Sequence, residues 1–144
     1  MCQANEAVKC FDSGFNCAQA VFSTYCEQLG LDKKTALKLS CGLGAGMGRM
    51  GDTCGAVTGA YLLIGLKHGK CVEGDNRPKE KTYELVQEFS KRFKQRNGST
   101  ICKELIQVDF KDGDPQKVTE QVQAVCPHVV RDAAEIIEEM LFNE

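Results

Sequence analysis

The sequence lacks the features that mark several common classes of protein. Its 144 residues carry a formal net charge of only −2, so no excess of positive charge is present to attract nucleic acid. The longest apolar run, Ala56 to Leu66, is interrupted by a threonine and two glycines and is too short to span a bilayer. The first residues contain no basic region followed by a long apolar stretch, which argues against a secretory signal. We therefore expect a cytoplasmic protein with no nucleic-acid partner and no membrane insertion.

Alternation of apolar and polar residues, the pattern of a half-buried strand, is also nearly absent. Apolar residues at helical spacing, bounded by recognisable caps, recur along the chain instead. Apolar residues make up 42% of the sequence and charged residues 26%, which is typical of a globular domain, and the length suits one domain. The sequence predicts an all-α protein, a compact single-domain bundle of about six or seven short helices over residues 1–144.

Caps and apolar periodicity give the expected helix boundaries. The expected helices are Gln3 to Asp12, Asn16 to the residue before Gly30, Thr35 to Cys41 behind an Asp32 cap, Asp52 to His68, Pro78 to about Asn97, and a short helix after Ser99 or Thr100. A weaker helical pattern covers Pro115 to Val125, and a last helix is expected to begin at Pro127. The stretch GLGAGMGRMG, residues 42–51, holds five glycines in ten positions and is expected to be a loop.

Closely spaced cysteine pairs are missing, although the chain contains nine cysteines. No two of them are three residues apart, so the signatures of zinc ribbons, thioredoxin-like sites and haem attachment are absent. Structural disulfides are rare in a reducing compartment, and an odd number of cysteines agrees with free thiols. Any site shared by several cysteines must therefore be assembled by folding.

Four of the nine cysteines fall at expected helix starts. They are Cys17, Cys54, Cys102 and Cys126. A helix N-terminus presents unpaired N–H groups and a partial positive charge, which favour a thiolate by roughly 0.3 to 1 kcal/mol. Thiolates are the nucleophilic and metal-binding form of cysteine. The remaining five are interpreted as packing residues: Cys2, Cys10, Cys26, Cys41 and Cys71.

Convergence of these four thiolates would require compensation of their charge. At about 6 to 7 Å separation and an effective dielectric constant near 20, each pair would repel by roughly 2.5 kcal/mol, or on the order of 15 kcal/mol for six pairs. A converged quartet therefore needs a cationic centre, or must protonate most of its thiols or oxidise them into pairs. Iron–sulfur clusters and zinc are the two cationic centres that four cysteines commonly bind.

Glycines beside Cys54 suggest close approach of another group. Gly55 and Gly59 remove side chains from one face of the expected helix, so that a neighbouring helix or an inorganic core can come near; close helix packing alone is the alternative. In the glycine-rich segment 42–51, Gly48 and Arg49 are candidates for contact with a cofactor, through backbone N–H groups and a guanidinium. For Arg49, a salt bridge that holds the fold is the competing interpretation.

Four stretches of the sequence resemble the family of redox-active proteins labelled C_GCAxxG_C_C. They are GFNCAQAV at 14–21, GMGRMGDTCGAVTGA at 46–60, CKEL at 102–105 and CPHVVRDAAEIIEEML at 126–141, in order over nearly the whole chain. The four cysteines of the family fall on the four selected above. The resemblance implies a redox role, and a similar domain in certain multi-haem cytochromes is associated with an iron–sulfur centre. The label spells Gly-Cys-Ala, whereas this chain has Thr53-Cys54-Gly55.

Other signals are weaker. GMGRMG at 46–51 matches G-x-G-x-x-G but follows an expected helix and not a strand, which argues against a dinucleotide site. His128 is a candidate substitute ligand or proton shuttle, with an ordinary surface histidine as the alternative. A basic cluster near the end of one helix is interpreted as solvated, with docking of an acidic partner as the alternative: Lys91, Arg92, Lys94 and Arg96.

Three functions remain open on the sequence alone. The first is a cluster of iron and sulfide, with two irons favoured ([2Fe–2S]), bound by Cys17, Cys54, Cys102 and Cys126 for electron transfer to a redox partner protein or a small redox substrate. The second is a thiol–disulfide oxidoreductase that uses the same cysteines catalytically without metal. The third is a structural module stabilised by zinc. The sequence leaves open whether the chain is a monomer or a homodimer.

Overall fold

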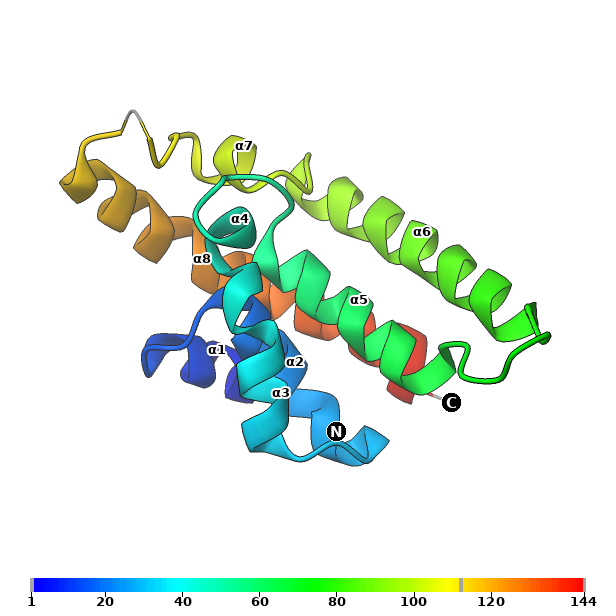
Figure 1. The fold of residues 1–144 in the computed structure, drawn as a ribbon. Helices are drawn as coiled ribbons and strands as arrows, with labels where there is room; N and C mark the ends of the chain where they lie inside the picture. The colour runs from blue at the N-terminus through cyan, green and yellow to red at the C-terminus, as the bar shows by residue number, and fades with distance from the viewer. Residues whose placement is uncertain (1, 112, 144) are drawn as a thin grey trace.

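The computed structural model describes residues 2–111 and 113–143, and within them the protein is built from helices (Figure 1). The α-helices are α1 (Ala4–Asp12), α2 (Cys17–Tyr25), α3 (Lys33–Ser40), α4 (Gly44–Met47), α5 (Gly55–His68), α6 (Arg77–Asn97), α7 (Cys102–Ile106) and α8 (Pro115–Ile137). Short 3-10 segments follow α2 and α3, at Cys26–Leu29 and Cys41–Leu43, and a π-helical turn, Glu138–Phe142, follows α8. The all-α prediction is confirmed.

Helices α2 and α5 pack against each other at the centre of the molecule, with α1 and α8 beside them and the long α6 along α5 and α8 (Figure 1). Residues Gly55 to Ala60 of α5 are all buried. A Cβ atom on Gly59 would lie 2.8 Å from the carbonyl oxygen of Ala18, so glycine at this position lets the two helix backbones touch. None of the described helices is both long and apolar enough to cross a membrane.

Most expected helix ends are confirmed by their caps. Asn16 and Gln19 form a reciprocal capping box at the start of α2, and the Asp32 side chain accepts a hydrogen bond from the Thr35 N–H at the start of α3. Gly30 and Gly98 adopt the left-handed conformation that ends the preceding helices. The sequence is therefore informative wherever a side chain or a glycine closes a helix locally.

The expected helix start at Pro127 is wrong. The weak pattern at 115–125 and the last segment form one helix, α8, with Pro127 inside it. A proline fits helical φ, but it removes one backbone hydrogen bond and its ring crowds the carbonyl four residues before it. The burial of α8 around it, including Val129, Val130 and Ala133, holds the helix together. Cys126 therefore lies in the body of a helix and not at a cap.

Two further starts are shifted. The helix expected from Asp52 begins at Gly55, with Cys54 as its N-cap residue. Cys102 is the first residue of α7, preceded by Ile101, and Ser99 accepts a hydrogen bond from the Ile101 N–H at 2.9 Å. These shifts move Cys54 and Cys102 closer to the helix ends than the sequence predicted.

The glycine-rich segment is more ordered than the expected loop. Residues 45–49 all have positive φ, between 55° and 68°, and so form a left-handed turn that includes Ala45, Met47 and Arg49. Each residue other than glycine costs roughly 1–2 kcal/mol in this conformation. Backbone hydrogen bonds close the turn, from the Asp52 N–H to the Gly46 oxygen at 2.9 Å and from the Gly51 N–H to the Ala45 oxygen at 3.3 Å. Alternate glycines make this conformation accessible to the segment.

Candidate functional site

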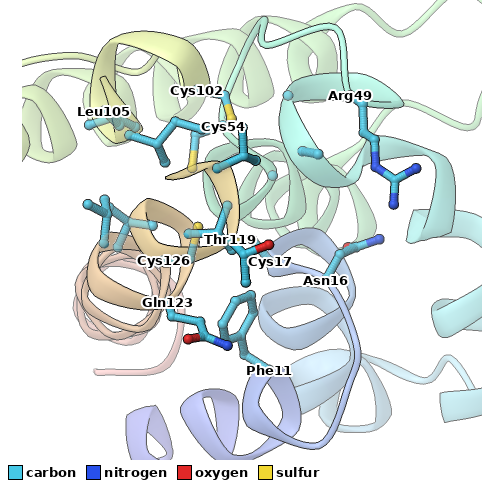
Figure 2. A pocket seen from close by; sticks show the side chains of 18 of the residues that line it. Phe11, Asn16, Cys17, Arg49, Cys54, Cys102, Leu105, Thr119, Gln123 and Cys126 are labelled. Atoms are coloured by element: carbon cyan, nitrogen blue, oxygen red, sulfur yellow. The ribbon is translucent and has the colours of Figure 1, made fainter. Parts of the chain in front are cut away.

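The four selected cysteines line one pocket of about 480 Å³ (Figure 2). They come from the starts of α2, α5 and α7 and from the middle of α8, and each is only 4% to 8% exposed. Residues that are 37, 48 and 24 positions apart along the chain thus meet, as the sequence argument required. The pocket is the candidate functional site of the protein.

The starts of α2 and α5 bring Cys17 and Cys54 together. A Cβ atom on Gly55 would lie 2.9 Å from the Ala18 nitrogen and 3.2 Å from the Cys17 Cβ, closer than side chains normally approach. Glycine at 55 therefore permits the first turn of α5 to rest directly on the first turn of α2. This explains a glycine next to a cysteine at the head of a helix.

A short piece of backbone pairing brings Cys54 and Cys102 together. Thr53 and Ile101 form an isolated antiparallel bridge. The Cys54 N–H donates to the Thr100 oxygen at 2.7 Å, and the Cys102 N–H donates to the Asp52 oxygen at 2.6 Å. Gly46 of the left-handed turn closes over this pair, since a Cβ there would lie 2.7 Å from the Cys102 Cβ.

Cys126 reaches the pocket from α8 and pairs with Cys17. The Cys17 thiol donates a hydrogen bond to the Cys126 sulfur. Pro127 has no N–H, so the helical hydrogen bond to the Gln123 carbonyl is missing one turn before it, and Gln123 also lines the pocket. Cys126 also lies close enough to Cys54 and Cys102 for its charge to raise the pKa of each, so the four cysteines form one group around the pocket.

Burial helps to raise the pKa values of three of the four thiols, so that they stay protonated at neutral pH. It raises the pKa of Cys54 from 9.0 to about 12, although hydrogen bonds from the Ala56 and Val57 N–H groups act in the opposite direction. Burial and the neighbouring Cys126 raise the pKa of Cys102 to about 12. The hydrogen bond to Cys126, burial and the other sulfurs raise the pKa of Cys17 well above 9.0. Helix starts therefore do not ionise these three thiols by themselves.

Cys126 behaves differently from the other three. The hydrogen bond from the Cys17 thiol lowers the pKa of Cys126, and burial opposes this effect. The residue with the lowered pKa is thus the one that lies inside a helix. Without an added cation the site is mostly in the thiol form at neutral pH, as the repulsion of four converged thiolates requires.

The donor set suits thiophilic metals, but the sulfurs are not arranged around a single ion. Within the described residues, no group of three or more His, Cys, Asp or Glu side chains is positioned to hold a metal ion. One tetrahedral ion needs sulfurs roughly 3.8 Å apart, given metal–sulfur bonds of about 2.3 Å. The four cysteines line one cavity without surrounding a single point, which fits a larger core better than it fits one ion.

Of the three candidate cofactor contacts, two line the pocket. Gly55 and Arg49 lie in its wall, whereas Gly48 is not among the lining residues and Gly46 takes that place. Arg49 is exposed and forms no ion pair with any residue that the structure describes, so the interpretation as a salt bridge that holds the fold finds no partner. Gly46 could have been singled out from the sequence only by knowing the turn geometry.

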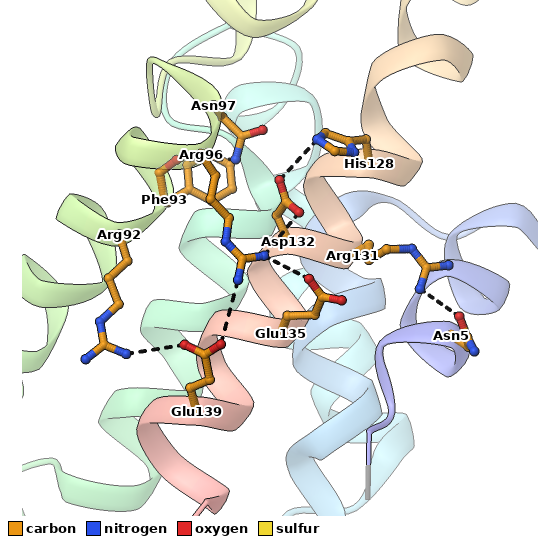
Figure 3. Close-up of polar contacts among 10 residues, drawn as sticks. All are labelled: Asn5, Arg92, Phe93, Arg96, Asn97, His128, Arg131, Asp132, Glu135 and Glu139. Carbon is orange, nitrogen blue, oxygen red and sulfur yellow. Dashed lines mark hydrogen bonds and ion pairs between the residues drawn. The ribbon is translucent and has the colours of Figure 1, made fainter.

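His128 and the basic cluster lie elsewhere. His128 is 65% exposed at its side chain, contacts Asp132 at 3.2 Å and is not one of the residues that line the pocket. Arg96 forms ion pairs with Glu135 and the buried Asp132 of α8, and both Arg92 and Arg96 pair with Glu139 of the π-helical turn after α8 (Figure 3). Half of the cluster therefore joins α6 to α8 and to the turn that follows it, and is not simply solvated.

Sequence reasoning recognised Asn16 as a cap but missed its second contact. Its side-chain amide donates to the Cys41 carbonyl at 2.9 Å and so ties the start of α2 to the segment before the left-handed turn.

Sequence reasoning also missed an apolar part of the pocket wall, which comprises Phe11, Leu105, Phe110, Val118 and Val122. Helical periodicity gives no sign of this wall, because apolar residues on a helix face are usually core.

Comparison with known families identifies one match. The family described as "Putative redox-active protein (C_GCAxxG_C_C)" matches residues 15–140, which include all four cysteines of the pocket. No curated protein and no solved structure shows significant similarity to the chain.

Proposed function

The chain belongs to the C_GCAxxG_C_C family of redox-active proteins, and we propose that its four buried cysteines hold a small iron–sulfur cluster, a [2Fe–2S] centre, for electron transfer. The observation that carries this proposal is the convergence of Cys17, Cys54, Cys102 and Cys126 on one pocket from four separate segments. Buried thiols do not ionise at neutral pH without a cation to replace their protons, and irons of a cluster supply that charge.

The spread of the four cysteines around the pocket favours two irons over one metal ion. A [2Fe–2S] cluster takes two cysteines on each iron, and the pocket offers four cysteines in all. When bound, such a cluster accepts and releases one electron at a time.

The chain itself supplies ligands, burial and hydrogen-bond donors. The low exposure of all four cysteines limits access of water, which together with hydrogen bonding sets the reduction potential of a cluster. The N–H groups of Ala56 and Val57 point at the Cys54 sulfur and favour its ionised form. Gly46 and Gly55 let the backbone come into contact with Cys102 and Cys17, where any larger residue would overlap its neighbours.

Elemental analysis of protein purified without oxygen tests the proposal. We expect about two irons and two acid-labile sulfides per chain, with visible charge-transfer absorption, and a Cys54→Ala variant that loses both. A Cys71→Ala variant is the matched control, because Cys71 is exposed and does not line the pocket. Colourless protein without metal would refute the cluster, and zinc without iron would instead support a structural zinc module.

The hydrogen bond between Cys17 and Cys126 favours thiol–disulfide exchange as a second candidate function. The Cys126 thiolate would attack a substrate disulfide and release one thiolate as a mixed disulfide forms. The Cys17 sulfur, after losing its proton, would attack Cys126 and release the second substrate thiol. The substrate disulfide is then reduced by two electrons, and Cys17 and Cys126 are oxidised to a disulfide.

Mass mapping after titration with an oxidised dithiol distinguishes this candidate. It predicts a reversible Cys17–Cys126 disulfide in metal-free protein, and a trapped mixed disulfide at Cys126 in the Cys17→Ser variant. Absence of any reversible pair among the four cysteines would exclude it.

A further inference from the structure

The pocket extends beyond the four sulfurs. Its volume of about 480 Å³ lies within the range of roughly 300–1,000 Å³ that is usual for sites that bind small organic molecules. Five half-buried apolar side chains form part of its lining; this apolar wall consists of Phe11, Leu105, Phe110, Val118 and Val122. None of these side chains can ligate a metal, so the apolar wall offers contact area for a different kind of molecule.

The apolar wall belongs to segments outside the central helix pair. It comes from the end of α1, from α7 and the connection after it, and from the first half of α8. The first half of α8 extends away from the rest of the bundle (Figure 1). Its residues Val118 and Val122 are half-buried and line the pocket, so a ligand there would remove further apolar surface from water.

Arg49 provides a charge for the same pocket. It lies in the left-handed turn, with φ of 67°, and is one of the lining residues of the pocket; its guanidinium lies near Asn16, with the cysteines between it and Leu105 (Figure 2). Its guanidinium forms no ion pair or hydrogen bond with any described residue. Carboxylates bind guanidinium groups through two parallel hydrogen bonds, which makes an unpaired arginine at a pocket a suitable anion partner.

We propose that this pocket binds a small carboxylic acid with an apolar body, with the carboxylate on Arg49 and the body on the apolar wall beside the four cysteines. The site holds both kinds of contact in one cavity, and acidic side chains contribute little to it, since Asp12 is the only carboxylate among the described lining residues. The proposal does not depend on a cluster, because none of its contacts uses a cysteine. The competing explanation is that the wall only shields a metal centre from water.

Calorimetric titration of the anaerobically purified protein with three matched probes separates these explanations. Octanoate, octan-1-ol and octylamine share an apolar chain and differ in the charge of the head group. We expect octanoate to bind about tenfold more tightly than octan-1-ol, which corresponds to one added ion pair in a partly desolvated site, and octylamine to bind most weakly. Equal affinities for octanoate and octylamine, or no saturable binding of octanoate, would overturn the proposal.

Variants assign the two contacts. Arg49→Gln should remove the preference for octanoate over octan-1-ol, whereas Arg77→Gln, on a surface arginine outside the pocket, should leave it unchanged. Val122→Thr keeps the side-chain shape and should weaken octanoate and octan-1-ol alike. Iron and sulfide contents should be the same in Arg49→Gln as in the parent protein. A loss of iron in this variant would assign Arg49 to the metal centre and refute the carboxylate site. Failure of the cluster proposal is a different outcome, because it would show as absence of iron from the parent protein.

Discussion

The side chain of Asn16 occupies the space that a Cβ atom on Gly44 would need, and its Nδ2 atom lies nearest to the ideal Cβ position. Asn16 caps the helix that carries Cys17 and donates a hydrogen bond to the Cys41 carbonyl, so it fixes the segment that leads into the left-handed turn. A single asparagine thus links one cysteine to the turn that covers another. The close contact with Gly44 makes this link testable.

Gly44→Ala should destabilise the protein by about 1–3 kcal/mol, because the new methyl group overlaps the Asn16 side chain. Urea denaturation measures the free energy of unfolding. Gly42→Ala is the control, since nothing lies within 4 Å of its Cβ position and its change should stay within about 0.5 kcal/mol. Equal effects of the two substitutions would contradict the packing described for Asn16.

Gly55→Ala should separate the starts of α5 and α2, because its Cβ would lie 2.9 Å from the Ala18 nitrogen. The expected result is a metal content well below that of the parent protein, as Cys17 and Cys54 no longer approach one core. Gly65→Ala in the same helix meets nothing within 4 Å and should be neutral or stabilising by up to about 1 kcal/mol. Iron and sulfide analysis with thermal melting compares the two, and normal iron content in Gly55→Ala would argue against a site between these helix starts.

The stability of reduced, metal-free protein should fall at alkaline pH. The pKa of Cys54 and that of Cys102 are about 12 in the folded protein, against 9.0 for an ordinary thiol, so the unfolded chain releases these protons first. Their contribution is fully present below pH 9 and is lost as pH rises from 9 towards 12, by up to roughly 1.4 kcal/mol per pH unit for each thiol.

Urea titrations at pH 7, 9 and 10 follow this loss in the parent protein and in Cys54→Ala. The variant should show a smaller decrease between pH 9 and 10, because one of the three pocket thiols with a raised pKa is gone. A Cys71→Ala variant should keep the decrease of the parent protein, since Cys71 is exposed. Stability that is unchanged up to pH 10 in the parent protein would contradict protonated, buried thiols at this site.

Pro127→Ala should stabilise the protein by about 1–2 kcal/mol. The alanine restores the N–H that bonds to the Gln123 carbonyl within α8, and this gain is partly offset by a more flexible unfolded chain. Pro115→Ala at the first turn of the same helix restores no helical hydrogen bond and should give no gain. Thermal unfolding compares the two variants, and a destabilised Pro127→Ala would show that proline shapes α8 at Cys126.

The sequence by itself determined the helical class and most helix ends, because these depend on neighbours within one turn: the Asn16–Gln19 capping box, the Asp32 cap, and the glycines at 30 and 98. It also selected Cys17, Cys54, Cys102 and Cys126, although the reason given for Cys126 was wrong, since Pro127 does not begin a helix. Local patterns cannot report whether surrounding burial will carry a helix through a proline.

Only the tertiary structure decided how the cysteines meet and how they ionise. Contact between α2 and α5 at Gly55, pairing of 53 with 101, and the left-handed turn at 45–49 all join residues far apart in the chain. The protonation of the thiols follows from the same packing, because removal from water outweighs the few N–H groups that a helix start provides. Desolvation depends on what the rest of the chain places around a sulfur, and no short stretch of sequence contains that information.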